Sequence, residues 1–153
     1  MHFRLVDQVL QCTPEGAVTV KNVTLAEEYL QDHFPGFHVL PGVFMLEALV
    51  QTARLVLEAR DQARPGGIPR RMVLGGVRAL RYGMFVRPGE SLRSEVTLDK
   101  ETDDGSVVFR ANATVLRVAR EAGATAIGSA AAASPDTAVS GRFTMRPVRM
   151  LHL

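Results

Sequence analysis

The sequence predicts an α+β fold in which one antiparallel sheet wraps around a single long, buried helix. Three observations lead to this prediction. Residues 43–63 read as a helix whose first turns have hardly any polar face, as in a helix that other structure encloses. Two strand-like segments precede this helix and at least three follow it. The chain has 153 residues, the size of one compact domain, and one sheet is the simplest cover for one helix.

The N-terminal part predicts two strands, at residues 3–10 and 17–23. Between them, Thr13-Pro14-Glu15-Gly16 is typical of a tight turn, with proline second and glycine last. Thr24 is followed three residues later by Glu27, which predicts a short helical turn with a capped N-terminus. This segment therefore supplies one edge of the expected sheet and leads toward the helix.

The loop at residues 33–42 is rich in proline and glycine and cannot be regular helix or strand. The helix that follows gains charge only toward its C-terminal end, so we expect it to emerge there into solvent. Arg64-Pro65-Gly66-Gly67 then ends it.

The second half of the chain is predicted to be β-structure, and glycines mark its irregular points. A strand over residues 72–82 is interrupted at Gly75-Gly76, where we expect a bulge, and Asp103-Asp104-Gly105 predicts a hairpin. The remaining segments are a turn at 86–90, strands at 92–100, 106–118 and 142–148, and a low-complexity stretch at 124–133. This layout is a hotdog fold, and we expect residues 1–153 to form a single hotdog domain.

The composition excludes several classes of protein. No apolar run reaches the roughly 18 residues of a membrane helix, and the N-terminus lacks the features of a signal peptide. Cys12 is the one cysteine, which excludes an internal disulfide and suits a reducing cytoplasm. There is no basic tract or zinc-ligand spacing, so a nucleic-acid partner is not expected.

Arginine dominates the positive charge, since Lys21 and Lys100 are the only lysines among 18 basic residues. Two interpretations stay open. One is genome composition. The other is a surface for an acidic or phosphorylated partner, because the guanidinium fork pairs well with carboxylate and phosphate.

Two residues stand out as candidates for chemistry. Glu47 lies inside the most apolar stretch of the chain, where a carboxylate must be paired, protonated or functional. His33 precedes Phe34-Pro35-Gly36, a segment stiffened by proline. Taken singly, Glu47 could bond to a neighbouring strand and His33 could be a loop residue. Together with the Gly42 amide at the helix N-terminus, where N–H groups favour negative charge, they predict a catalytic site.

The motif from His33 to Gln51, which reads HFPGFHVLPGVFMLEALVQ, resembles the signature of the β-hydroxyacyl-[acyl-carrier-protein] dehydratases, the FabA/FabZ family. Residues 3–9 with 21–24, and residues 85–92, agree with it, so the resemblance spans about residues 3–118. Where the family has proline, this chain has His38, for which we expect a packing or surface role. The tail at 121–153 is not matched.

The resemblance implies that His33 and Glu47 face each other across a dimer interface. It also implies that the Gly42 amide, next to Val43, binds the thioester oxygen, and that Gln51 orients the acid. Glutamate rather than aspartate at position 47 makes the motif similar to that of the FabZ-type branch, whose members dehydrate the substrate without isomerising the double bond. No metal or organic cofactor is expected.

This chemistry suits the residue types. Water loss from a 3-hydroxyacyl thioester needs a base at C2, and the ordinary pKa of histidine lies near neutrality, which suits His33. It also needs an acid for the leaving hydroxide, a role for Glu47 if apolar surroundings keep it protonated. The Gly42 N–H would stabilise the enolate-like charge.

The resemblance further implies an acidic acyl carrier protein as partner and a homodimer or a trimer of dimers. We expect the carrier to dock on basic side chains, for which the candidates are Arg70, Arg71, Arg142, Arg146 and Arg149. Alternatives stay open: a hotdog acyl-thioesterase, a non-catalytic acyl-carrier-binding hotdog protein, or a dehydratase of a polyketide or specialised lipid pathway. The acyl chain length, and carrier protein against coenzyme A, are not determined by the sequence.

Overall fold

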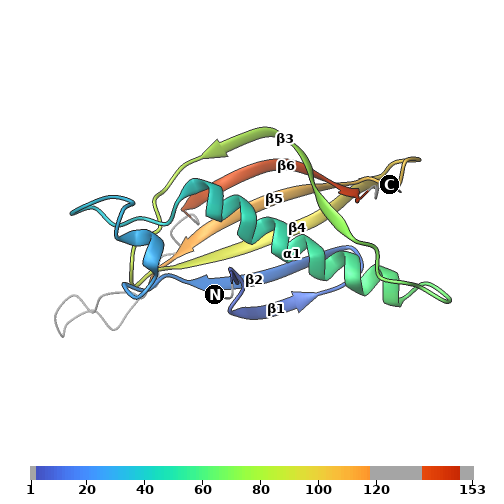
Figure 1. Ribbon diagram of the computed structural model, residues 1–153, viewed down its shortest axis with the longest axis horizontal. Helices are drawn as coiled ribbons and strands as arrows, with labels where there is room; N and C mark the ends of the chain where they lie inside the picture. The colour runs from blue at the N-terminus through green and yellow to red at the C-terminus, as the bar shows by residue number, and fades with distance from the viewer. Residues whose placement is uncertain (1–2, 118–135, 149–153) are drawn as a thin grey trace, which may run out of the picture.

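A computed structural model describes residues 3–117 and 136–148 (Figure 1). One long helix lies against one face of a six-stranded sheet. In chain order the elements are β1 (Gln8–Cys12), β2 (Gly16–Asn22), the 3₁₀ turn η1 (Glu28–Leu30), α1 (Gly42–Gln62), β3 (Met72–Tyr82), β4 (Ser91–Glu101), β5 (Val107–Leu116) and β6 (Thr137–Pro147).

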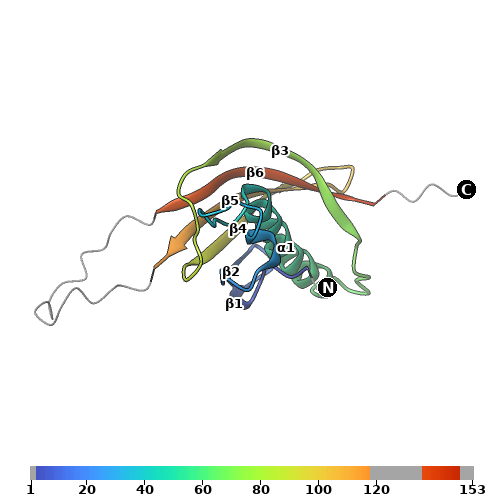
Figure 2. The ribbon, with the colours of Figure 1, turned by 60° about the vertical axis from the view of Figure 1, so that its left-hand side comes forward.

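The sheet has the strand order β1-β2-β4-β5-β6-β3, and every neighbouring pair is antiparallel. The sheet arches over α1 (Figure 2). By the strand order, β1 and β3 are its two edge strands. In β4 the buried Leu92, Ser94 and Val96 face the helix, and they alternate with the more exposed Arg93 and Glu95 on the other face of the sheet. The predicted hotdog fold is thereby confirmed. No helix in the described part of the chain has the length and apolarity to cross a membrane.

Helix α1 places its buried side against the sheet and leaves a stripe uncovered. Leu49, Val50 and Val56 are completely buried in the core. On the other side Val43 is 66% exposed, and Arg54 is exposed as well. The sequence predicted a helix enclosed nearly all round, and for this stripe that is wrong, because the sheet of one chain covers only one side.

The first strand begins later than predicted, at Gln8 rather than Phe3. The residues before it pack onto the helix instead: Leu5 and Val6 are buried, and the Leu5 N–H donates to Oε1 of Gln51 at 2.8 Å. Burial of these apolar side chains, with a helix side chain satisfying the backbone, replaces sheet pairing in this segment.

The predicted helix cap at Thr24 is wrong. The 3₁₀ turn begins after Glu27 and has no side-chain cap, and Thr24 only accepts the Glu27 N–H through its carbonyl oxygen, at 3.2 Å. The carboxylate of Glu27 instead accepts a 2.7 Å hydrogen bond from Nζ of Lys21. Lys21 is buried, with 7% of its surface exposed. A buried ammonium is costly without a partner, so this ion pair outweighs a cap.

The predicted turns and the bulge are confirmed. Thr13 donates its N–H to the Gly16 carbonyl at 2.8 Å, and Gly105 closes the hairpin with φ of 80°. The register of β3 shifts between Leu74 and Gly76. The last strand is longer than predicted and begins at Thr137 rather than residue 142. The low-complexity stretch at 124–133 lies outside the described residues.

Candidate active site

The loop before α1 is a closed turn tied to the sheet. Phe34 and Phe37 exchange backbone hydrogen bonds of 3.0 and 2.9 Å around Gly36, whose φ of 77° favours glycine. The Leu40 N–H donates to the carbonyl of Val86, in the connection before β4, at 2.8 Å. These bonds fix the chain that carries the histidine.

His33 is held in one tautomer. Its Nδ1 lies 2.9 Å from the Val39 carbonyl oxygen, and because a carbonyl can only accept, Nδ1 is the protonated nitrogen. The ring stacks on Phe34, with 4.1 Å between centroids. Nε2 therefore carries the lone pair and is the nitrogen that can take a proton.

His38 restrains the same loop. Its Nδ1 donates to the Leu30 carbonyl oxygen at 2.6 Å, so this hydrogen bond joins the loop to the end of the 3₁₀ turn. The side chain is half-buried. A hydrogen bond thus supplies a restraint at the position where the resemblance implied a proline.

The N-terminus of α1 offers unpaired amides. Pro41 precedes the helix without a side-chain cap, and its carbonyl accepts from Phe44 and Met45. Among the described residues nothing accepts the N–H groups of Gly42 and Val43. Together with the helix dipole, two such amides can bind an oxygen that gains negative charge.

Tyr82, at the end of β3, lies directly against Gly42. A Cβ atom added to Gly42 would stand 2.8 Å from Cε1 of the tyrosine ring. Real side-chain contacts are not that short, so only glycine fits at this position while the ring stays in place.

Glu47 is one turn further along α1 and is not enclosed by apolar groups. Its side chain is 28% exposed, with Nη1 of Arg54 at 3.5 Å from Oε1. Nε2 of Gln51 donates to Oε1 at 3.1 Å, while Oε1 of Gln51 accepts the Leu5 N–H. The expectation of a carboxylate in apolar surroundings is wrong for the single chain, because its neighbours are an amide and a guanidinium.

The structure thus brings some predicted site residues together and leaves others apart. Gln51 contacts Glu47, and Gly42 and Val43 present adjacent amides. No hydrogen bond, ion pair or ring contact within residues 3–117 and 136–148 joins His33 to Glu47.

Two neighbours of the site were missed from the sequence. Arg54 follows Glu47 by seven residues, two helical turns, and this spacing alone could have indicated a shared helix face. Tyr82 gave no signal, because only the pairing of β3 with β6 carries it to the helix N-terminus.

Arg70, predicted for carrier docking, is engaged inside the protein. Its Nε donates to Oδ1 of Asp61 at 2.9 Å, and its Nη1 donates to Glu101 at 2.8 Å. The Asp61 side chain is 3% exposed and also accepts the Arg70 N–H. Within the chain Arg70 anchors the end of α1 to β4, because a buried carboxylate needs a cation beside it. Its role in carrier docking stays a prediction.

Glu101 accepts hydrogen bonds from Arg60, Arg64 and Arg70, which form an arginine cluster around it. Burial by itself would raise the pKa of its carboxyl, but hydrogen bonds from Arg70, Arg64 and Arg60 outweigh that effect and lower it to about 2. The cluster holds Glu101 ionised at neutral pH.

The other predicted docking residues lie in two places. Arg71 is exposed and lines a cavity of about 320 Å³ that Arg54 also lines. Arg142 and Arg146 alternate along β6 with the buried Phe143 and Met145, so they lie on the sheet face opposite α1. Arg149 lies outside the described residues.

Comparison with known proteins adds findings of three kinds: a family model, two relatives and a solved structure. A family model described as "FabA-like domain" matches residues 1–121. The "3-hydroxyacyl-[acyl-carrier-protein] dehydratase FabZ" of Latilactobacillus sakei is 44% identical over 100 residues, which cover 65% of this chain and 69% of that protein. Its namesake in Oenococcus oeni is 42% identical over 101 residues, covering 65% and 70%. The solved structure titled "The Dehydratase Heterocomplex ApeI:P from Xenorhabdus doucetiae" has a TM-score of 0.67 and 16% identity, covering 95% of this chain and 84% of that one. At that identity the likeness shows the fold alone.

Proposed function

The chain belongs to the FabA-like domain family, and from this premise we propose that it dehydrates 3-hydroxyacyl-[acyl-carrier-protein] to the trans-2-enoyl thioester in type II fatty acid synthesis. The observation that carries the proposal is the hydrogen bond from Nδ1 of His33 to the Val39 carbonyl oxygen, which leaves Nε2 available as a base. We place the protein in the cytoplasm, since Cys12 is a free and exposed thiol, which a reducing compartment preserves.

His33 begins the reaction. Its Nε2 takes a proton from C2 of the bound thioester, and the electron pair of that C–H bond moves toward the carbonyl. The N–H groups of Gly42 and Val43 stabilise the negative charge that this places on the thioester oxygen. The loop bonds around His33 hold the ring so that no reorientation is needed during the step.

Glu47 completes it. In the proposed dimer, where a second chain covers this side of α1, the protonated form of Glu47 delivers a proton to the C3 oxygen, the C3–O bond breaks, water leaves, and the C2–C3 double bond forms. Arg54 stabilises the carboxylate that remains, and Gln51 keeps its oxygen in position. The proton held by His33 then returns to Glu47 before the next turnover.

The active unit that we propose is a homodimer in which His33 of one chain faces Glu47 of the other. Two features support it. The two residues make no contact within the described part of one chain. Strand β3 is an exposed edge, and apolar side chains on and after it are exposed, among them Val77, Tyr82 and Phe85. An edge strand with exposed apolar groups is stabilised by pairing with a copy of itself.

We further propose Arg71 as a docking residue for the acidic carrier. It is exposed, makes no ion pair with any described residue, and shares a cavity with Arg54, the partner of Glu47. Exposed charge acts mainly on encounter and is screened by salt. Arg71→Gln should therefore raise KM for the carrier-linked substrate and leave a short pantetheine thioester unaffected, whereas Arg93→Gln, on the outer face of β4, should change neither.

The decisive experiment is mass spectrometry of a 3-hydroxyacyl carrier protein incubated with the protein. Dehydration removes one water, about 18 mass units, whereas release of a free acid would identify a thioesterase and no change would identify a binding protein. His33→Ala and Glu47→Gln should each lower kcat about 10²- to 10⁴-fold. Glu58→Gln, an exposed acid on the same helix, is the matched control and should keep its turnover.

Mixing the two inactive variants tests the shared site. A mixed dimer contains one site with both native residues, so activity should recover in part once subunits exchange. Exchange demonstrated by mass spectrometry without recovery would show that each site belongs to one chain, and this result would leave the dehydratase reaction itself standing.

A further inference from the structure

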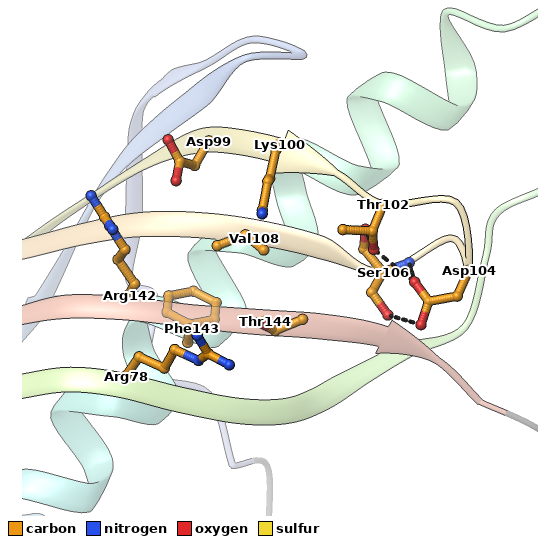
Figure 3. Close-up of a pocket in the computed structure, with 10 residues that line it drawn as sticks. All are labelled: Arg78, Asp99, Lys100, Thr102, Asp104, Ser106, Val108, Arg142, Phe143 and Thr144. Atoms are coloured by element: carbon orange, nitrogen blue, oxygen red, sulfur yellow. Dashed lines mark hydrogen bonds between the residues drawn. The ribbon is translucent and has the colours of Figure 1, made fainter.

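The outer face of the sheet, opposite α1, carries a hollow that the proposed reaction does not use. Its volume is about 450 Å³, and it lies over β3, β6, β5 and β4. Lys100 of β4 and Arg78 of β3 stand on opposite sides of it, with Val108 of β5 between them (Figure 3). Arg142 of β6 lines it as well.

Basic side chains meet on this face by register. Arg142 is the Cα partner of Arg78 on one side and of Arg110 on the other. Like charges directly opposite each other destabilise a sheet unless a counter-charge lies between them. Of the three, only Arg110 has an acidic partner in the described part of the chain: its Nη2 lies 2.9 Å from Oδ1 of Asp99.

The acids that line the hollow are fewer than its cations. Asp99 is occupied by Arg110, and Asp104 accepts hydrogen bonds from Thr102 and Ser106. Arg78, Arg142 and Lys100 make no ion pair or hydrogen bond with any residue in the described ranges. The hollow is therefore positive: with Asp99 paired to Arg110, its lining holds three cations, Arg78, Lys100 and Arg142, against the single carboxylate of Asp104.

A second hollow of about 290 Å³ continues the first and extends the basic surface. It shares Arg78, Ser106 and Thr144 with the first and adds Arg146. The bulge of β3 makes room for it: a Cβ on Gly75 would stand 2.9 Å from the Arg146 side chain, and one on Gly76 would meet nothing within 4 Å. The missing side chain at Gly75 thus leaves room for the Arg146 side chain.

We propose that these hollows bind a small molecule that carries a diphosphate group. The guanidinium groups supply paired donors for phosphate oxygens, and Lys100 adds a third charge. The cations come from three strands, β3, β6 and β4, and a diphosphate offers them more negative charge and more acceptor oxygens than a single phosphate does. The hollow has the size of a small-molecule pocket, and a flat protein partner would not require one.

Isothermal titration with pyrophosphate at physiological salt tests the proposal without using the dehydratase activity. We expect saturable binding at one site per chain, weakened at least 10-fold by Arg78→Gln and by Arg142→Gln. Arg71→Gln, an exposed arginine outside the hollow, should alter the affinity less than twofold. Both hollow variants replace exposed side chains, and a thermal melt checks that they fold.

Three results would overturn the proposal. Sulfate binding as tightly as pyrophosphate would mean that nothing on this face distinguishes a diphosphate. An equal loss with Arg71→Gln would mean diffuse attraction to a basic protein. Binding of an acidic carrier protein that Arg142→Gln abolishes, with no binding of pyrophosphate, would identify a protein-docking surface instead.

Discussion

Replacing Gly42 by alanine tests whether the helix N-terminus holds the reacting thioester. The new Cβ would stand 2.8 Å from Cε1 of Tyr82, about 0.7 Å inside ordinary van der Waals contact. Either the ring or the amide must move by that amount. A displacement of about 1 Å at a reacting centre costs about 10²-fold, so we expect kcat to fall between about 10- and 100-fold. Alanine otherwise favours a helix, so the protein should stay folded.

The assay is steady-state turnover of a short 3-hydroxyacyl pantetheine thioester, with thermal melts to confirm folding. Gly76→Ala is the control, since nothing lies within 4 Å of its Cβ, and it should keep full activity. In a Tyr82→Ala background the effect of Gly42→Ala should shrink, because the ring that it strikes is gone. Activity within twofold of wild type for Gly42→Ala, or an undiminished loss in that background, would refute this reasoning.

The remaining predictions concern the charged groups of α1 and its anchor. Asp61→Ala should lower the free energy of unfolding by about 3 kcal/mol in urea titrations, because Arg70 loses its buried partner; a loss below about 1 kcal/mol would show that Glu101 alone suffices. The pKa of Glu101 is lowered from its ordinary value of 4.5 to about 2. The ionised carboxylate therefore stabilises the fold fully at a pH above 4.5, and this stabilisation disappears as the pH falls toward 2. The free energies of unfolding of wild type and Glu101→Gln should therefore differ by about 1 kcal/mol at pH 6 and become equal in acid. A difference that does not change with pH would contradict this role of the ionised Glu101. Arg54→Gln should lower kcat about 10-fold with KM unchanged, and Arg54→Lys should restore part of it, because the cation stabilises the carboxylate of Glu47; a change in KM alone would mean that Arg54 binds substrate.

The hotdog fold could be predicted from the sequence because its main signals are local. An apolar stretch over residues 43–63 and alternating segments on both sides depend only on the order of side chains. The same is true of the turn before Gly16, the hairpin at Gly105 and the bulge at Gly75, where glycine takes a conformation or a space that other residues do not. These features depend on backbone geometry within a few residues.

Boundaries were less predictable where a local signal competed with a distant partner. Residues 3–6 alternate like a strand, but Leu5 finds its hydrogen-bond partner in Gln51, 46 residues away. Thr24 and Glu27 have the spacing of a cap, yet the carboxylate of Glu27 is taken by Lys21, whose burial only the folded chain creates.

The sequence by itself determined which residues make up the candidate site: His33 on a proline-stiffened loop, Gly42 at a helix start, and Glu47 with Gln51 one turn beyond it. Only the tertiary structure decided their surroundings. It set the tautomer of His33 through a carbonyl six residues away, and it placed Tyr82 against Gly42 through the pairing of β3. It also gave Glu47 polar rather than apolar neighbours, because the sheet of one chain covers only one side of α1. Residue identity and local geometry are written in the sequence, whereas burial and charge pairing depend on which distant elements the fold brings together.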